Sequence, residues 1–434
     1  MLANKEYKDS GVSWLGNIPA LWNIVKTKRH FQNEKRVAGK YANQYERLAL
    51  TMNGVIKRDK EDAEGLQPES FEGYQVLEQN QLVFKLIDLE NVKTSRVGLS
   101  PYTGIVSPAY IILHNDQQDN RFYYYYYMNM YYQEIFNYLG GEGVRSALNA
   151  KDLLETPIPD ISLKQQKVIA DYLDKECARI DDIVEKQRNI IEKLKEYKKS
   201  VITEAVTKGL NPNAEMKDSG IEWVGDVPAD WEVRKMKTLG VFSSSGIDKT
   251  LNPDEPIVRI INYTDVYGNG TYILTEKKYM VVSAPAQKIK ENLVEKGDLI
   301  FTPSSETIED IGLSALVDVD LENTAFSYHV LRFVFNEKFD HRYKKYLCNN
   351  HFVLNWFSSH AKGTIRQTLS RDIFKSCLVF VPPLSEQSAI ADYLDQKCTE
   401  IDSVIEKREK MIDLLTEYKK SLIYECVTGK KEVA

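Results

Sequence analysis

Apolar residues recur at alternating steps of four and three along residues 167–208, and the same pattern returns along residues 388–429. This spacing is typical of a coiled-coil seam. We therefore predict two long amphipathic helices that are each other's partner, rather than two surface helices packed separately on their own domains. The expected seam consists of Leu173, Cys177, Ile180, Val184, Ile191 and Leu194 in the first copy, and Leu394, Cys398, Ile401, Ile405, Ile412 and Leu415 in the second.

The two helical stretches belong to a longer internal repeat. IADYLD occurs at residues 169–174 and 390–395, and EYKKS at residues 196–200 and 417–421. Near the start of each copy, YKDSGVSWLGNIPALW at residues 7–22 returns as MKDSGIEWVGDVPADW at residues 216–231. Before each helix, GEGVRSAL answers AKGTIRQTL, and both lead through a proline-containing loop to a glutamine, Gln166 or Gln387. The chain is thus one unit of a little over 200 residues used twice.

The middles of the two copies share little sequence, although both show the same kind of pattern. Short apolar runs bounded by Gly, Pro and Asn predict strands at residues 81–89 and 104–113, and at residues 255–263, 297–302, 313–319 and 326–335. Helices are expected at residues 121–139 and 342–357. The tyrosines within residues 123–132 could stack on bases, but we favour a face packed against its sheet, because the second copy replaces them with other bulky apolar residues.

The expected fold class is α+β, with two mostly antiparallel globular domains on a duplicated helical frame. The predicted boundaries are 1–162 and 211–383 for the globular domains, and 163–210 and 384–434 for the helices. The first helix ends where the second domain begins. If the ends of that domain lie close together, as domain termini often do, the helices must run antiparallel. The molecule would then have an internal pseudo-two-fold axis.

Composition narrows the class further. The 434 residues are 43% hydrophobic and 28% charged, which is ordinary for a globular protein. Because no run of about 18 apolar residues and no secretion signal is present, we expect no membrane association and a cytoplasmic location. Three of the five cysteines fall on the seams, so disulfides are not expected. The six histidines show no ligand spacing, and no metal is predicted.

Motifs for nucleotide chemistry are absent from the sequence. No G-x-G-x-x-G or G-x-x-x-x-G-K-[ST] loop occurs, and no Asp or Asn is followed by Pro-Pro and an aromatic residue. The sequence therefore indicates a binding protein rather than an enzyme. Its net charge of −6 argues mildly against unaided binding to nucleic acid, although a local basic surface is compatible with that total.

Several of the repeated words resemble a known family. VPPLSEQSAIADYLD at residues 381–395, its weaker twin at residues 158–174, GIVSPAY at residues 104–110 and GDLIFTPSSE at residues 297–306 resemble the DNA specificity subunit of type I restriction-modification systems. The resemblance implies that each variable domain reads one half of a split sequence in double-stranded DNA. It also implies docking of two methyltransferase subunits and, through them, restriction and translocase subunits. S-adenosylmethionine, ATP and Mg²⁺ would be bound by those partners, and this chain would hold no cofactor.

Polar residues beside basic ones in the loops of each domain are the expected DNA contacts, because bases are read by hydrogen bonds and phosphates by charge. Arg145 and Arg366 occupy equivalent places in the repeat, and each would either contact a phosphate or hold its domain to the helix. The candidate residues are Lys93, Thr94, Ser95, Arg96, Tyr102, Ser107 and Arg145 in the first copy, and Lys249, Asn262, Tyr263, Thr264, Ser304, Ser305 and Arg366 in the second.

Two other classes of function stay open at this level. One is a coiled-coil scaffold that binds protein partners without reading DNA, which the acidic balance favours. The other is an enzyme, such as a self-contained nuclease, whose site has no recognisable motif.

Overall fold

The computed structural model describes residues 6–62, 68–87, 89, 96–139, 147–221, 224–308 and 310–433. The chain divides into two compact units, Met1–Arg188 with Glu409–Ala434, and Asn189–Arg408. Each unit contains one globular domain and about half of each of the two longest helices, α4 (Leu163–Lys208) and α11 (Leu384–Val427). Among the described residues, no helix combines the length and the apolar character needed to cross a membrane.

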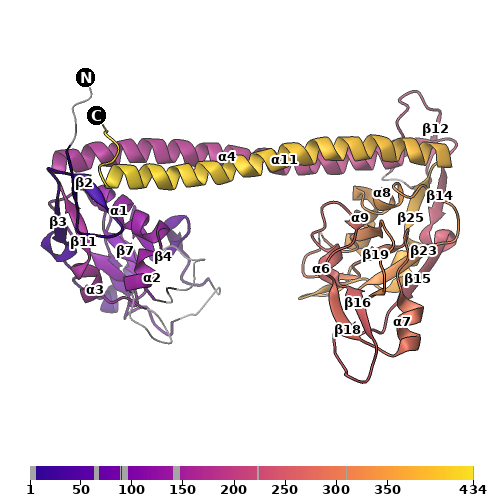
Figure 1. The fold of residues 1–434 in the computed structure, drawn as a ribbon, viewed down its shortest axis with the longest axis horizontal. Coiled ribbons are helices and arrows are strands. Elements are labelled where there is room, and N and C mark those ends of the chain that lie inside the picture. Colours follow the sequence, from indigo (N-terminus) through magenta and orange to yellow (C-terminus); the bar gives the residue numbers. More distant parts are fainter. Residues whose placement is uncertain are drawn as a thin grey trace. The chain divides into compact units, whose positions relative to one another are not determined.

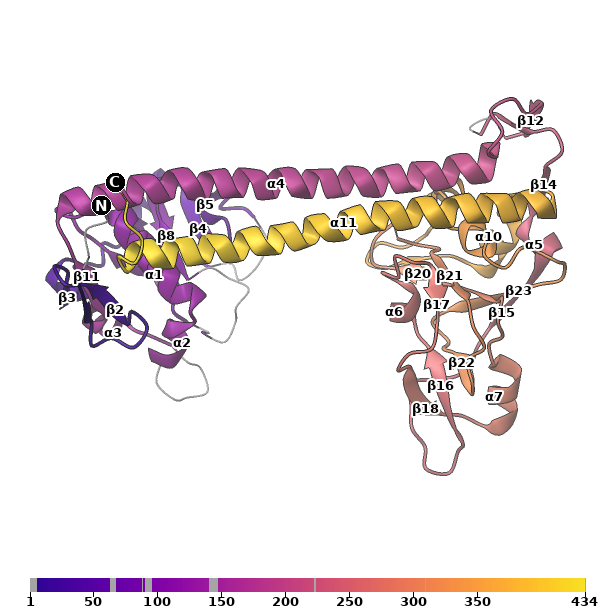
Figure 2. The ribbon, with the colours of Figure 1, turned by 45° about the horizontal axis from the view of Figure 1, so that its top comes forward.

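In the first unit, the N-terminal half of α4 packs beside the C-terminal half of α11 (Figure 2). Lys419 pairs with Asp181 at 2.6 Å, and Leu422 and Cys426 share one buried cluster with Leu173 and other seam positions. The four predicted residues Leu173, Cys177, Ile180 and Val184 are all buried there, while Ile412 and Leu415 pack against the edge of the cluster. The same cluster includes the globular domain, so the helices and the domain share one core.

The second unit repeats this arrangement with the other two halves. Lys198 of α4 pairs with Asp402 of α11 at 2.7 Å, and Gly209 lies close to Glu386, so residue numbers rise along one helix as they fall along the other. Antiparallel packing within the unit follows directly. The predicted seam residues Leu394, Cys398, Ile191 and Ile401 are buried, and Leu194 and Ile405 are half-buried.

The globular domain of the first unit contains a four-stranded sheet in the order β5-β4-β9-β6 and a three-stranded sheet in the order β10-β7-β8 (Figure 1). All pairings are antiparallel except β4 with β9. The strands are β1 (Tyr7–Asp9), β2 (Asn17–Pro19), β3 (Asn23–Lys26), β4 (Arg47–Thr51), β5 (Gly54–Arg58), β6 (Gln75–Leu77), β7 (Leu82–Phe84), β8 (Val97–Leu99), β9 (Gly104–Val106), β10 (Ile111–Leu113) and β11 (Pro157–Asp160), and the helices before α4 are α1 (Asn120–Tyr132), α2 (Ile135–Leu139) and α3 (Ala150–Glu155).

The tyrosine-rich run forms α1, which lies between the sheet and α4 (Figure 1). Tyr123, Tyr126 and Tyr127 are fully buried, and their hydroxyls contact the Pro159 carbonyl, the Pro157 carbonyl and the Thr27 hydroxyl. Burial raises the pKa of each of these phenols. These side chains therefore serve the core and present no platform for bases. The predicted single helix is interrupted at Glu134, whose φ of 56° separates α1 from α2.

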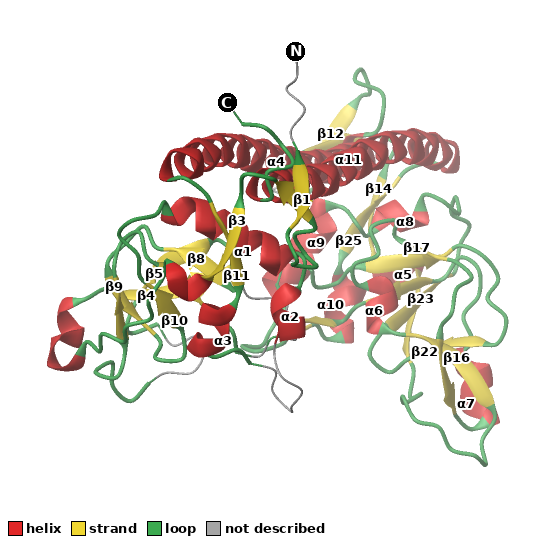
Figure 3. Ribbon diagram, turned by 60° about the vertical axis from the view of Figure 1, so that its left-hand side comes forward, coloured by secondary structure: helices red, strands yellow, loops and turns green. Residues whose placement is uncertain are grey.

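The second globular domain has a five-stranded sheet in the order β15-β23-β19-β21-β17 and a three-stranded sheet in the order β18-β16-β22 (Figure 3). The pairs β16 with β22 and β17 with β21 are parallel. The elements are β12 (Met216–Asp218), β13 (Asp226–Pro228), β14 (Glu232–Lys235), α5 (Met236–Leu239), β15 (Gly240–Ser244), β16 (Ile257–Ile261), α6 (Tyr263–Val266), β17 (Ile273–Leu274), β18 (Met280–Ser283), α7 (Ala286–Asn292), β19 (Leu299–Phe301), β20 (Ser304–Ser305), β21 (Ser314–Val317), β22 (Thr324–Phe326), β23 (Leu331–Phe335), α8 (Lys344–Leu347), α9 (His351–His360), β24 (Gln367–Thr368), α10 (Arg371–Ser376) and β25 (Leu378–Val381).

Two predicted elements of this domain are each divided. The run at residues 326–335 becomes β22 and β23, joined by a turn, and the helix at residues 342–357 becomes α8 and α9. Asn349 and Asn350 cause the second break: the amide of Asn349 donates to the Ser314 carbonyl at 2.8 Å, and the Asn350 side chain accepts from the N–H of Val353 at 3.0 Å. An N-cap of this kind begins a new helix.

A two-stranded pairing closes the base of each globular domain. In the first unit β3 pairs with β11, and in the second β14 pairs with β25, both antiparallel over four residue pairs. β3 and β14 follow only a short two-stranded pairing at the start of each copy, and β11 and β25 lead directly into the long helices, so the chain enters and leaves the main part of each domain at one place. The two ends of each domain therefore lie close together, which is the arrangement that antiparallel helices require.

The buried seam predicts a clear difference between two leucines of α11. Leu394→Ala removes a side chain with no exposed surface and should lower the free energy of unfolding of the second unit by about 2–5 kcal/mol. Leu414→Ala, at a leucine of α11 that is 71% exposed and belongs to the first unit, should change the free energy of unfolding of its own unit by less than about 0.5 kcal/mol. Thermal and urea unfolding followed by circular dichroism would measure both. Equal effects of the two substitutions would contradict the assigned seam.

Candidate nucleic-acid interface

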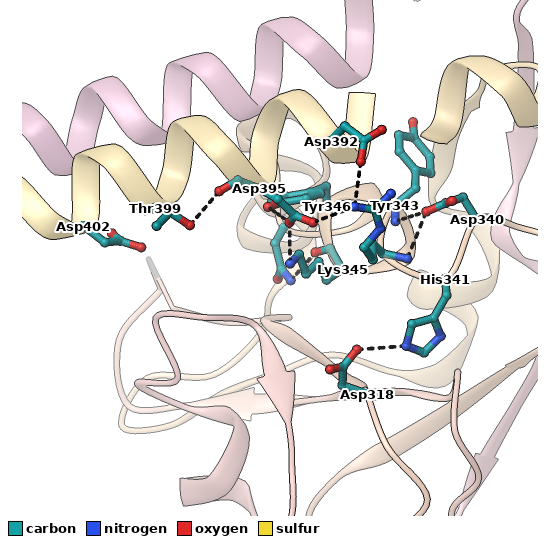
Figure 4. A network of polar contacts seen from close by, with 12 residues as sticks. Asp318, Asp340, His341, Tyr343, Lys345, Tyr346, Asp392, Asp395, Thr399 and Asp402 are labelled. Carbon is teal, nitrogen blue, oxygen red and sulfur yellow. Dashed lines mark hydrogen bonds and ion pairs between the residues drawn. The ribbon is translucent and has the colours of Figure 1, made fainter. Parts of the chain in front are cut away.

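The repeated IADYLD motif holds each globular domain to its long helix. In the second unit, Arg342 contacts Asp392 at 2.7 Å and Asp395 at 3.5 Å. Asp395 also accepts a hydrogen bond from the Tyr346 hydroxyl at 2.7 Å and pairs with Lys345 at 2.7 Å (Figure 4). Asp392 and Asp395 lie on α11. Their partners lie in α8 or just before it. The aspartates thus join the helix to the domain.

The repeated glutamine completes this joint. The backbone N–H of Asp340 donates to the Gln387 side chain at 2.9 Å, and the Ser388 hydroxyl donates to the Asp340 carboxylate at 2.6 Å. Burial by itself would raise the pKa of Asp340, but the bonds from Ser388 and from the N–H groups of Tyr343 and Arg342 outweigh it, so this pKa is lowered. The carboxylate is therefore held in its charged form.

The first unit repeats the arginine, tyrosine and glutamine contacts of this joint. Arg121 contacts both aspartates of its own copy of the motif, at 2.7 and 2.8 Å, and the Tyr125 hydroxyl donates to Asp174 at 2.8 Å. The N–H of Asp119 donates to the Gln166 side chain at 2.8 Å. A hydrogen bond to Asp119 is the largest cause that raises the pKa of Arg121. The second copy has the sequence PPLSEQ at residues 382–387, and the first has ISLKQQ at the matching residues 161–166. In spite of this difference, Gln166 makes the same contact as Gln387.

On the second globular domain, a tight hairpin at residues 362–368 projects beside β20. Lys362 and Thr368 exchange backbone hydrogen bonds of 3.1 and 2.8 Å, and β24 pairs with β20. Gly363 has a φ of 137°, and a Cβ there would lie 2.0 Å from the Arg366 carbonyl, so only glycine fits this turn. The tip of the hairpin is thereby held in one conformation.

Four of the predicted DNA contacts meet at this hairpin. Arg366 donates from Nε to the Ser304 hydroxyl at 3.2 Å and lies over the Tyr263 ring at 5.9 Å. The Tyr263 hydroxyl donates to Ser305 at 3.4 Å. Arg366 therefore contacts β20 and α6, whereas Arg342 makes the joint to the helix. Of the two roles considered for Arg366, attachment to the helix is supported by no contact among the described residues.

Further positive charge surrounds the hairpin. The pKa of His329 is lowered, chiefly by burial and then by the nearby positive charges of Lys249 and Arg366. This effect places Lys249, another predicted contact, in the same electrostatic neighbourhood. Thr264 is exposed on α6. Together with the hairpin these residues form a small basic and hydroxyl-rich surface on an otherwise acidic chain, which we call the hairpin surface: Lys249, Tyr263, Thr264, Ser304, His329, Lys362, Ile365 and Arg366.

Two of the predicted base contacts are placed differently from expectation. Asn262 is only 6% exposed, and its N–H donates to the Asp265 carboxylate at 2.7 Å in the turn that starts α6. Ser305 is also buried, and its hydroxyl accepts from Tyr263 and from the N–H of Thr307. Both lie inside the loop, so Asn262 shapes α6 and Ser305 positions Tyr263.

The structure also contradicts the role expected of Arg96 in the first domain. Its side chain is 2% exposed and donates to the Leu89 carbonyl at 2.5 Å. A buried guanidinium with this partner stabilises the interior and cannot reach DNA. Tyr102 is exposed with Lys57 at 5.4 Å from its ring centre, whereas Ser107 is half-buried in a turn. Lys93, Thr94, Ser95 and Arg145 lie outside the described residues.

The sequence reasoning missed the most conspicuous member of the hairpin surface. Ile365 is 91% exposed at the tip of the hairpin, next to Arg366. A single exposed apolar side chain is common on protein surfaces, so Ile365 is of interest because it stands beside Arg366 in this hairpin. The signal was available, because Gly, Ile and Arg stand together in a repeated word. Of the stacked pair Tyr263 and Tyr267, whose ring centroids are 5.1 Å apart, only Tyr263 was among the predicted contacts.

The described residues hold no group of three or more His, Cys, Asp or Glu side chains that could bind a metal ion. The five cysteines are free and buried. Burial is the main cause of the raised pKa of the thiols, about 11 for Cys177 and about 12 for Cys426. They therefore act as apolar packing groups rather than nucleophiles.

Two globular domains, each held to its long helix by the same kind of joint, make up a duplicated chain. The family described as Type I restriction modification DNA specificity domain matches residues 21–196 and 228–412, once in each copy of the repeat. These two matches span more than half of the chain, and the chain belongs to this family.

Named relatives agree with this membership. The specificity subunit of type I restriction enzyme MjaVIII from Methanocaldococcus jannaschii is 27% identical over 282 residues, which are 64% of this chain and 63% of the relative. The EcoKI specificity subunit of Escherichia coli K12 is 20% identical over 309 residues, 69% of this chain and 63% of the relative. The matches therefore span less than two thirds of either relative.

The fold has a counterpart among solved structures. A chain from a study of complex assembly and conformational transition of the type I R-M system superposes with a TM-score of 0.68. The superposition covers 94% of this chain and 98% of the other at 12% sequence identity. At this identity the likeness concerns the fold.

The joint between domain and helix should be sensitive to its charge. Asp395→Asn keeps the side-chain volume but removes the charge that Lys345 and Tyr346 contact, and should destabilise the second unit by about 1–3 kcal/mol. Asp413→Asn, at an exposed aspartate on the same helix, serves as the control and should have no measurable effect. Thermal unfolding of both variants would test the assignment, and an unchanged midpoint for Asp395→Asn would contradict it.

Proposed function

We propose that this chain is the DNA specificity subunit of a type I restriction-modification system. The observation that carries the proposal is the family match to each half of a chain whose frame is duplicated and whose domains differ. Two different domains on one frame would read two different half-sites, so the target would be asymmetric and bipartite with an unread gap. The chain itself would be non-catalytic.

The hairpin surface supplies the chemistry for one half-site. Arg366 and Lys249 suit phosphate oxygens, while the Ser304 hydroxyl, the Tyr263 ring and Ile365 suit base edges and the thymine methyl group. Contacts between Arg366, Ser304 and Tyr263 fix the surface before DNA arrives. Preorganisation of this kind reduces the entropy lost on binding. In the first domain, Tyr102 and Lys57 are the corresponding candidates, and Ser107 is a weaker one.

The helices are the proposed binding surface for methyltransferase subunits, two copies per chain, to which restriction and translocase subunits would add. In the first unit, Met411, Leu414 and Tyr418 follow one another at steps of three and four along α11 and are all exposed. They form one exposed apolar stripe that flanks the buried seam. Exposed apolar stripes of this type mark protein interfaces. Methyl transfer, ATP hydrolysis and DNA cleavage would belong to these partners and their S-adenosylmethionine, ATP and Mg²⁺.

Comparison of the methylomes of strains with and without this chain tests the proposal. We expect one bipartite, asymmetric methylated sequence with a fixed unread gap, present only when the chain is present. Replacing the second globular domain by that of a relative should change one half-site and leave the other. A methylome that does not depend on the chain would show that it is not a specificity subunit.

Substitutions in the hairpin surface should separate phosphate contacts from base contacts. Arg366→Ala should weaken all DNA sequences alike and reduce the slope of log affinity against log salt by about 1. Ile365→Ser should instead reduce affinity for the specific target without changing that slope, because an apolar contact releases no counterions.

DNA binding by the complex of this chain with its methyltransferase, measured from about 50 to about 200 mM salt, would provide both slopes. Lys237→Ala, which removes an exposed charge from α5, is the control for net charge. If Ile365→Ser had no effect on either specific or random duplex, the hairpin would not face DNA.

A further inference from the structure

Both units contain the same corner, in which a glycine after a long helix packs on a proline and a tryptophan. In the second unit, Gly209 follows α4 with a φ of +72°, and a Cβ there would lie 3.3 Å from Trp231 and 2.7 Å from Glu386. The indole N–H of Trp231 donates to the Glu386 carboxylate at 2.7 Å. Trp231 has no exposed surface. The corner is therefore closed by a carboxylate from the chain itself.

The first unit has the same corner without this carboxylate. Gly429 has a φ of +70°, and a Cβ there would lie 2.9 Å from Trp22 and 2.5 Å from Pro19. The residue that corresponds to Glu386 is Gln165, directly before the matched glutamine. Its side chain accepts from the Ser162 hydroxyl at 3.1 Å and thus turns back on its own helix end. Trp22 remains 6% exposed, and no described residue accepts its indole N–H.

An open cavity of about 730 Å³ lies at this place in the first unit. Trp22, Gln165, Gly429 and the apolar Val168 line it. In the second unit Glu386 fills the matching position next to the tryptophan. The first unit therefore has the indole donor and open space where the Glu386 carboxylate lies in the second unit, with Gln165 in place of that glutamate.

The charges around the two corners differ in the same sense. Lys164 and Lys431 line the cavity of the first unit. At the matching places of the second unit, the residue before Glu386 is Ser385, and the second residue after Gly209 is Asn211. Two lysines thus replace two neutral residues. The carboxylate of Glu6 also lines the cavity and offsets one of their two positive charges. The cavity is suited to an incoming negative charge.

An apolar residue at the rim differs as well. Leu21 is 93% exposed and lines the cavity, whereas the matching residue before Trp231 is Asp230. An exposed leucine beside two lysines and an indole N–H matches a protein segment in which an acidic side chain stands next to an apolar one. A phosphate would use the lysines but not the leucine.

We infer that this cavity of the first unit binds an acidic side chain of a partner protein, which takes the place that Glu386 occupies in the second unit. The indole of Trp22 donates to the incoming carboxylate, Lys164 and Lys431 neutralise it, and Leu21 packs on the neighbouring apolar residue. The identity of the partner, a methyltransferase subunit, rests on the proposed function. The rest of the inference does not. The two halves of the duplicated chain would then bind that subunit unequally.

Two variants and a control test the inference in the full chain with the methyltransferase subunit of the same organism. Lys164→Ser with Lys431→Asn gives the first unit the residues of the second and should weaken the complex about tenfold, the effect of about 1.4 kcal/mol. Gln165→Glu supplies the missing carboxylate internally and should weaken it similarly without lowering the unfolding midpoint of the free chain. Lys175→Ser removes the same charge from an exposed position of α4 outside the cavity and should leave the affinity within about twofold.

Carbodiimide crosslinking of the wild-type complex provides a direct readout, because it joins a lysine amine to a carboxylate in contact with it. Mass spectrometry should find Lys164 or Lys431 joined to an aspartate or glutamate of the methyltransferase subunit. The inference would be overturned if both variants bound the methyltransferase subunit as tightly as Lys175→Ser does and no such crosslink formed. If the complex still methylated a bipartite target, the proposed function would be unaffected. Loss of DNA affinity with an unchanged protein complex would assign the cavity to phosphate instead. A chain that binds no methyltransferase would overturn both proposals.

Discussion

An arginine that pairs with the aspartates of the IADYLD motif is the interaction on which the rest of each unit depends. Arg342 with Asp392 and Asp395 connects the segment before α8 to α11, and Arg121 with the matching aspartates connects α1 to α4. The neighbouring glutamine bonds the backbone at the start of that helix. Because these groups are partly shielded from water and hydrogen-bonded on several sides, they fix orientation as well as position. A surface on the domain can be placed accurately only if this joint is rigid.

The division between a repeated frame and different middles has a physical basis. The frame residues satisfy one another: the seam, the joint and the two-stranded base need the same partners in each copy, and they are the same words in the sequence. The hairpin surface has no such constraint, because Arg366, Ser304 and Tyr263 need only support one another. A recognition surface can therefore vary without disturbing the core beneath it. This separation is what a protein with exchangeable specificity requires.

The corner at each helix end shows that duplication also leaves room for divergence within the frame. Trp22 and Trp231 occupy the same place, yet one is closed by Glu386 and the other faces a cavity edged by Lys164 and Lys431. Trp231 already has Glu386 as its acceptor, whereas Trp22 has none among the described residues, so an external carboxylate would stabilise the first unit more than the second. The two copies would then differ in function at a position where their backbones agree.

The sequence by itself determined the long helices, the seam, the repeat and the core role of the tyrosine run, because each depends on periodicity or on words that recur at fixed spacing. It did not determine which loop residues face solvent. Arg96 and Asn262 look like recognition residues in the sequence but are buried by neighbours distant along the chain, whereas Ile365 looks like core and is held in water by a glycine turn. The joint was visible only as a repeated word until the fold brought Arg342 to Asp395. Burial and side-chain pairing in loops depend on contacts between distant segments, and only the tertiary structure decides those.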